Sequence, residues 1–138
     1  MSKKNNGFSL VELIVVIAIM AVMVGIITPA YLAYVEKTRI QRDESAAGEI
    51  FRAAEIVVYT GEYDISDTVL VTFDSTGIHL NTQLINNAQI QEILQDHFGN
   101  QYQTAKPVSK KYSSMTYTVT ILPPEGDSLM PQLSAAWS

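Results

Sequence analysis

The sequence predicts an α+β protein in which one long N-terminal helix packs on a small antiparallel β-sheet domain. Three observations predict this fold class: an apolar run near the N-terminus, an amphipathic stretch that follows it without a break, and a C-terminal part with alternating segments separated by turns. With 138 residues, the chain has room for the helix and one small core, but not for a second globular domain.

The first part of the helix is long and apolar enough to cross a membrane. Residues 13–35 form a run of 23 residues without a charged side chain, and twelve of them are Leu, Ile or Val. At about 1.5 Å per residue, a helix over this run is roughly 35 Å long, which exceeds the hydrocarbon thickness of a bilayer. The sequence therefore predicts a single spanning helix, preceded by a short leader that carries Lys3 and Lys4.

One acidic residue, Glu12, stands at the start of this apolar run. An ionisable side chain beside an apolar span costs free energy unless it is paired, so Glu12 is a candidate functional residue whose partner is missing. The alternative interpretation is an acid at the membrane edge whose carboxylate reaches back to the headgroups.

The residues around Glu12 resemble the class III signal of type IV pilins and their relatives, over roughly residues 3–60. The resemblance is carried by a basic leader followed by Gly7, Phe8, Ser9, Leu10, Val11, Glu12 and Leu13. It implies a pilin-like fold, and it implies that a membrane prepilin peptidase cuts after Gly7 and methylates the new amino group of Phe8. A glycine suits this position because it lets an enzyme approach the backbone closely.

In the expected mature chain, Glu12 is the fifth residue and Pro29 the twenty-second, where the family commonly carries proline. Cleavage creates an ammonium group on Phe8, four residues before Glu12 and on the same helical face. This amine neutralises the carboxylate either within one chain or between neighbouring subunits. The resemblance implies the second arrangement, in which Glu12 sets the register of assembly.

Gly25 and Pro29 both weaken a helix, glycine through its backbone entropy and proline through its missing donor. For residues 25–29, the sequence therefore predicts either a kink in the membrane helix or a segment that unwinds when subunits pack into a filament.

Charge does not decide the orientation of the span, because cations flank it on both sides. The resemblance implies a cytoplasmic leader and an external remainder. The predicted divisions are a leader over 1–7, a membrane and filament-core helix over 8–35, its amphipathic continuation over 36–60, and an α+β head over 61–138. Ala30 and Ala33 offer an alternative signal peptidase site, with a secreted protein starting near Tyr34.

Beyond Pro29 the apolar and charged positions follow the helical period, which predicts a helix to about Tyr59 with Gly61 as its terminator. The apolar face comprises Ile40, Ala47, Ile50, Phe51, Ala54, Val57 and Val58. The charged face comprises Glu36, Lys37, Arg39, Arg42, Asp43, Glu44, Glu49 and Arg52. We expect the apolar face to pack on the head.

In the head, residues 68–73 and 78–80 flank the turn 74–77 and predict a β-hairpin. A second helix is predicted over 87–98, with Asn86 or Asn87 as its N-cap and Gly99 after its end.

Three further segments complete the head. Residues 111–122 alternate apolar residues with threonines, which predicts a strand that Pro123 ends. Residues 101–110 are expected to form a loop. Residues 125–138 are expected to form an irregular tail that is either disordered or packs on the sheet through Leu129, Met130, Leu133 and Trp137.

The charge balance is acidic, with 9 basic and 14 acidic residues. Removal of the leader leaves 7 basic and 14 acidic side chains, a net charge of −7, which disfavours nonspecific nucleic-acid binding. Lys106, Lys110 and Lys111 form a local basic patch flanked by Tyr102 and Tyr112. This patch is either a solvated loop or a contact with DNA or another polyanion.

The sequence shows no constellation that favours catalysis. It contains no cysteine, its histidines are His79 and His97, and no glycine-rich phosphate loop follows a strand. Asp96 and His97 are read as surface or capping residues at a helix end rather than metal ligands. Four acids considered for calcium, Asp64, Asp67, Asp74 and Glu125, lack the spacing of a calcium loop. We therefore predict no catalytic residue, metal or cofactor.

The sequence thus predicts a structural subunit of a type IV pilus, held in the cytoplasmic membrane and then assembled into a surface filament for adhesion, motility or DNA uptake. The resemblance implies as partners other copies of the chain, minor pilins, the prepilin peptidase, and an assembly platform with its ATPases. Two alternatives remain. A pseudopilin of a type II secretion or competence system shares the leader and helix, whereas an extracellular enzyme or receptor domain on a signal anchor retains residues 1–7.

Overall fold

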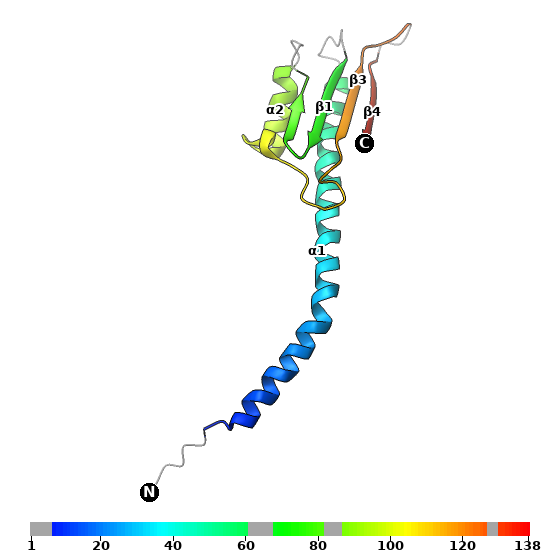
Figure 1. Ribbon diagram of the computed structural model, residues 1–138. Helices are drawn as coiled ribbons and strands as arrows, with labels where there is room; N and C mark the ends of the chain where they lie inside the picture. Colours follow the sequence, from blue (N-terminus) through cyan, green and yellow to red (C-terminus); the bar gives the residue numbers. More distant parts are fainter. Residues whose placement is uncertain (1–6, 61–67, 82–86, 127–129) are drawn as a thin grey trace. The chain divides into compact units, whose positions relative to one another are not determined.

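A computed structural model describes residues 7–60, 68–81, 87–126 and 130–138, in two compact units, Met1–Glu36 and Lys37–Ser138 (Figure 1). The elements in chain order are α1 (Leu10–Thr60), β1 (Val69–Asp74), β2 (Gly77–Leu80), α2 (Asn87–Phe98), the short 3₁₀ helix η1 (Tyr102–Thr104), β3 (Tyr117–Leu122) and β4 (Gln132–Trp137). A long apolar helix and a small antiparallel sheet confirm the predicted α+β, pilin-like fold class.

In the first unit, the side chains of α1 are exposed almost throughout, although nearly all are apolar. Among the described residues, α1 is the one helix that by length and composition is apolar enough to span a membrane. The helix continues without interruption through Gly25 and Pro29. The Thr28 hydroxyl donates a hydrogen bond to the Val24 carbonyl at 2.7 Å in the turn that precedes the proline. Unwinding on assembly therefore stays a prediction for the filament.

In the second unit, the four strands form an antiparallel sheet in the order β2-β1-β3-β4 (Figure 1). The hairpin prediction is confirmed: β1 pairs with β2 across the turn, with Phe73 opposite Ile78. β1 also pairs with β3, which places Val71 opposite Val119. The apolar residues on one face of β1 and β3 are buried, as their alternation predicts, and β3 ends immediately before Pro123.

The core of this unit joins the sheet to the second half of α1 and to α2. The buried residues of α1 include most of the predicted apolar face, whereas Ile40 and Phe51 are only half-buried. Ile90 and Leu94 of α2 enter the same cluster. The chain contains no cysteine, so the burial of these side chains, and not a disulfide, stabilises this unit.

The predicted bounds of α2 agree with the structure. Gly99 ends it with a φ of 79° and donates its N–H to the Gln95 carbonyl at 2.8 Å, which is a conformation that favours glycine. The predicted N-cap side chains, Asn86 and Asn87, lie outside the described part, as does the predicted terminator of α1, Gly61.

Two predictions for the C-terminal half are wrong. The strand begins at Tyr117, not at residue 111, because residues 109–114 turn, with the Ser113 N–H bonded to the Ser109 carbonyl at 3.1 Å. The expectation of an irregular or disordered tail is wrong for residues 132–137, which form β4 and pair with the whole of β3. Leu133 and Trp137 pack on the core, Met130 is exposed, and Leu129 lies outside the described residues.

The segment predicted as a loop over 101–110 contains η1, which lies close to the start of β2. A Cβ at Gly77, whose φ is +139°, would come within 1.7 Å of the Gln103 carbonyl oxygen. Only glycine therefore lets η1 approach this strand so closely.

Candidate functional site

The N-terminal end of α1 is organised by two reciprocal hydrogen bonds between Ser9 and Glu12. The Ser9 backbone N–H donates to Glu12 Oε2 at 2.9 Å, and the Glu12 N–H donates to Ser9 Oγ at 3.2 Å. Ser9 also accepts the first helical hydrogen bond, from the Leu13 N–H at 3.3 Å. Ser9 is therefore the N-cap of the helix and Glu12 its third residue, which together form a capping box.

The capping box fixes where the helix begins. Gly7, Phe8 and Ser9 precede α1 and are exposed, with the Phe8 side chain 93% accessible. Apart from the chain neighbours of Gly7, no atom in the described part of the chain lies within 4 Å of a Cβ built on this residue. The Gly7–Phe8 peptide bond thus lies in non-helical, accessible backbone, which is the conformation that a protease active site can admit.

Glu12 shares one face of the chain with Phe8 and with Val11, Val15 and Val16, all of which line a shallow apolar hollow. The sequence predicts that the Glu12 carboxylate has no nearby partner. The structure gives it a hydrogen-bond donor, the Ser9 N–H, but no cation faces it among the described residues. The pattern Ser-x-x-Glu before an apolar run is the signal that identifies this capping box in the sequence.

A second polar side chain with several partners, Asp43, was predicted on the charged face of α1 and is instead 2% exposed. Its carboxylate accepts the Val108 N–H at 2.9 and 3.1 Å and the Ser109 N–H at 2.8 Å. This side chain therefore joins the long helix to the loop before β3. Its position, four residues before Ala47 and seven before Ile50, is the sequence signal that places it on the apolar face.

The same loop is tied to the C-terminal strand by an aromatic stack. Tyr112 lies against Trp137 with ring centroids 4.1 Å apart, and its hydroxyl donates to Glu44 Oε1 at 2.8 Å. Lys111 Nζ donates to the Tyr112 hydroxyl at 2.7 Å, and this hydrogen bond is the largest cause that raises the pKa of Lys111. The Lys111 side chain, although 52% exposed, is thus tied to Tyr112 and Glu44, so the three lysines of the predicted basic patch are not equivalent.

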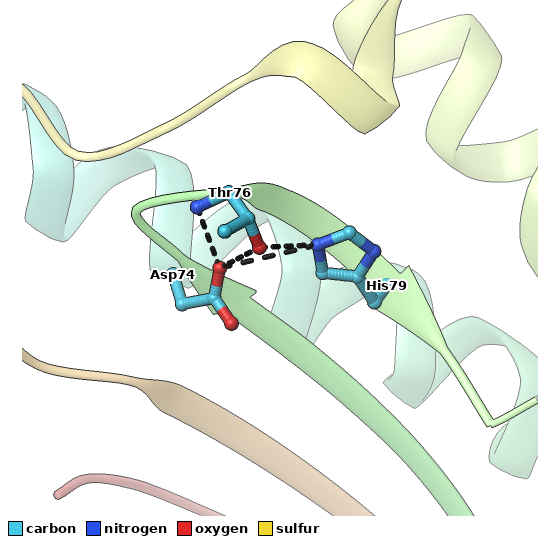
Figure 2. A network of polar contacts seen from close by, with 3 residues as sticks. All are labelled: Asp74, Thr76 and His79. Carbon is cyan, nitrogen blue, oxygen red and sulfur yellow. Dashed lines mark hydrogen bonds and ion pairs between the residues drawn. The ribbon is translucent and has the colours of Figure 1, made fainter.

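The hairpin turn holds a third polar cluster, formed by Asp74, Thr76 and His79 (Figure 2). The Asp74 carboxylate accepts both the N–H of Thr76, at 2.7 Å, and its hydroxyl. The Thr76 side-chain and backbone hydrogen bonds, with the nearby His79, lower the pKa of Asp74 more than partial burial raises it. The cluster therefore closes the turn as a side-chain-capped loop.

This cluster contains the residue types of a nucleophilic triad but not its geometry. His79 Nε2 lies 2.7 Å from Thr76 Oγ1 and 3.9 Å from Asp74 Oδ1, so the hydroxyl and the carboxylate meet the same ring nitrogen. In a triad, the carboxylate orients the other nitrogen. The described residues hold no group of three potential metal ligands, and Asp64, Asp67 and the His97 side chain lie outside them.

Comparison with known proteins gives results concentrated at the N-terminus. The prokaryotic N-terminal methylation motif matches residues 2–28. A fimbrial protein of Pseudomonas aeruginosa is 30% identical over 87 residues, which cover 54% of this chain and 56% of that protein. A type IV major fimbrial protein FimA of Dichelobacter nodosus is 32% identical over 62 residues, which cover 45% and 40%.

No solved structure matches this chain. The chain spans about half the length of the relatives that it matches. A capped, apolar N-terminal helix that carries the methylation motif defines a prepilin-like protein. The chain is accordingly similar to type IV pilins. The fimbrial proteins that it resembles come from two different bacteria.

Proposed function

We propose that this chain is a structural subunit of a type IV pilus, made as a membrane precursor and assembled into a surface filament through its N-terminal helix. One observation supports this proposal most directly. The methylation motif contains an exposed, non-helical Gly7–Phe8 bond that lies directly before a capped apolar helix. The names of the relatives, which are fimbrial proteins, support the choice of a pilus subunit, and a pseudopilin of a secretion or competence system is the alternative that shares the same leader and helix.

In this proposal, the leader 1–7 is removed on the cytoplasmic side by a prepilin peptidase, and the Phe8 amine is methylated. The span up to about residue 35 holds the subunit in the membrane and then enters the filament core, while the head faces outward. Because the apolar side chains of this span are exposed in the single chain, they require either lipid or neighbouring helices to leave water.

Glu12 is proposed to set the register between subunits. In the filament core its carboxylate meets the Phe8 ammonium of a neighbour, a charged partner added to the Ser9 N–H that the carboxylate already accepts within one chain. Pairing is then possible only at one axial offset between adjacent helices, since any other offset buries both charges unpaired.

The stretch between Gly25 and Pro29 is proposed to lose helical hydrogen bonds on assembly. Proline at position 29 cannot donate to the Gly25 carbonyl, and the Thr28 hydroxyl already competes for the Val24 carbonyl. Cryo-electron microscopy of the fibre should show non-helical backbone there. A straight, continuous helix through residues 21–30 in the fibre would refute this part of the proposal.

Substitution of Gly7 by leucine tests the processing step. The side chain has room in the structure, so folding and insertion should be unchanged, but the peptidase should no longer reach the backbone. Mass spectrometry of the purified chain should show an intact Met1 in the variant and a methylated Phe8 in the wild type.

The matched control is Gly48→Ala, which also has open space around its Cβ and lies far along α1 from the cut site. It should be processed normally. A wild-type chain that retains Met1 when the peptidase is present, or that starts near Tyr34, would overturn the pilin proposal in favour of a signal anchor or a secreted protein.

A further inference from the structure

The head unit has a groove between α1 and the segment that follows α2. Its volume is about 340 Å³, and it is lined on the α1 side by Arg42, Ala46 and Glu49. Phe98 and Lys106 are among the residues that line its other side. The groove thus combines an apolar surface with charged side chains.

The charges in the groove are not evenly distributed. Asp43 also borders it, but its carboxylate is already occupied by the N–H groups of Val108 and Ser109. Lys106 is two residues from Val108 and therefore lies at the Arg42 end, whereas Glu49 is about 10 Å further along the axis of α1. One end of the groove is thus basic, and neither Arg42 nor Lys106 forms an ion pair with any other residue that the structure describes.

The complementary feature lies on α2. Glu92 and Asp96 are exposed, one turn apart on the same face, and neither forms an ion pair within the described ranges. Like charges at this spacing repel, and a carboxylate in the last turn of a helix opposes the helix dipole. Both effects destabilise an isolated α2, and both are relieved by a cation supplied from outside the chain.

We propose that the groove binds the Glu92–Asp96 face of α2 from a second copy of this chain. Arg42 and Lys106 of one copy neutralise Glu92 and Asp96 of the next, and Ala46 and Phe98 contact the apolar parts of that helix. Two different patches of one chain make a heterologous contact, which propagates from copy to copy as an open filament when the rotation between copies does not close a ring. The inference rests on the proposed function and names the contact between heads that this function requires.

Charge exchange tests the contact in cells that express the full chain. The variant Arg42→Glu/Lys106→Glu should reach the membrane and be processed, but should yield at least roughly tenfold fewer filaments, because like charges then face each other. Glu92→Lys/Asp96→Lys should show the same loss. Combining all four substitutions should restore filaments. Lys37→Glu/Arg52→Glu, which changes the charge equally outside the groove, is the control and should assemble normally.

Disulfide trapping provides a second measurement, since the chain has no cysteine of its own. Ser45→Cys, at the groove, and Gln95→Cys, beside Asp96, are placed in separate copies and co-expressed. Oxidised filaments should give a covalent dimer from the mixed copies and none from either variant alone.

The outcomes separate the two proposals. The groove contact would be overturned if the charge-reversed variants assembled as fully as the wild type. It would also be overturned if the four combined substitutions failed to restore filaments and no mixed dimer formed. Either result would leave the pilin proposal standing. A processed wild-type chain that forms no filament in the presence of the assembly machinery would overturn both.

Discussion

Glu12→Ala should leave membrane insertion and cleavage intact, yet reduce surface filaments to near zero. In a water-free filament core, loss of the carboxylate leaves the Phe8 ammonium of each neighbour buried without a counter-charge. Removing one partner of a buried ion pair costs about 3–5 kcal/mol, which lowers the association constant at each contact by two or more orders of magnitude. Immunoblots of membrane and sheared fractions measure subunit level and filament yield separately.

The capping box allows a sharper pair of variants. Glu12→Gln keeps an oxygen that accepts the Ser9 N–H but removes the charge, whereas Ser9→Ala removes the capping hydroxyl and keeps the carboxylate. If charge pairing sets the register, the glutamine variant should fail to assemble and the alanine variant should assemble, with a loss of only about 1 kcal/mol in helix stability. The opposite result would show that Glu12 acts through the helix end and would remove the register argument.

Asp43→Ala should strongly destabilise the head. The substitution leaves the N–H groups of Val108 and Ser109 without their acceptor, and Ser109 is fully buried. Each unsatisfied buried donor costs about 1–3 kcal/mol, so we expect the free energy of unfolding to fall by about 2–5 kcal/mol. Urea unfolding of the full chain in detergent measures this change. Trp137, which is the single tryptophan, reports it through its stack on Tyr112.

Glu44→Ala is the matched control, because it removes a neighbouring carboxylate from the same helix. The Glu44 side chain is 52% exposed, and its ion pair with Lys111 is long, at 3.7 Å. We expect a loss of about 1 kcal/mol or less. If Asp43→Ala were as stable as the wild type, the role assigned to the buried carboxylate would be contradicted. If Asp43→Ala and Glu44→Ala lost the same free energy of unfolding, burial would add nothing to the contribution of Asp43.

The local elements of the fold were largely predictable, because each depends on residues close together in the sequence. The period of the apolar residues predicts α1 and its packing face, the turn at residues 74–77 predicts the hairpin, and Gly99 marks the end of α2. The Gly7–Phe8 motif is a local signal as well, and the methylation motif matches the segment that contains it. The Ser9–Glu12 capping box was equally local and was overlooked.

The wrong predictions concern residues whose structure depends on distant partners. Residues 111–116 were included in the strand because they precede an alternating segment. Asp43, more than sixty positions earlier, instead draws residues 108 and 109 to α1 by hydrogen bonds that a continuous strand would not make. β4 contains alanine, serine and glutamine, which are weak strand formers, and it is ordered by its pairing with β3 and by the packing of Trp137.

The sequence by itself therefore determined the long apolar helix, the methylation motif and the kind of head, since periodicity, charge and turn chemistry are properties of neighbouring residues. Only the tertiary structure decided that Asp43 is buried, that the C-terminal segment completes the sheet, and that Arg42 and Lys106 border one groove. These features depend on contacts between hydrogen-bond donors, acceptors and apolar surfaces that are far apart in the sequence. Tertiary packing determines those contacts, and no local sequence pattern does.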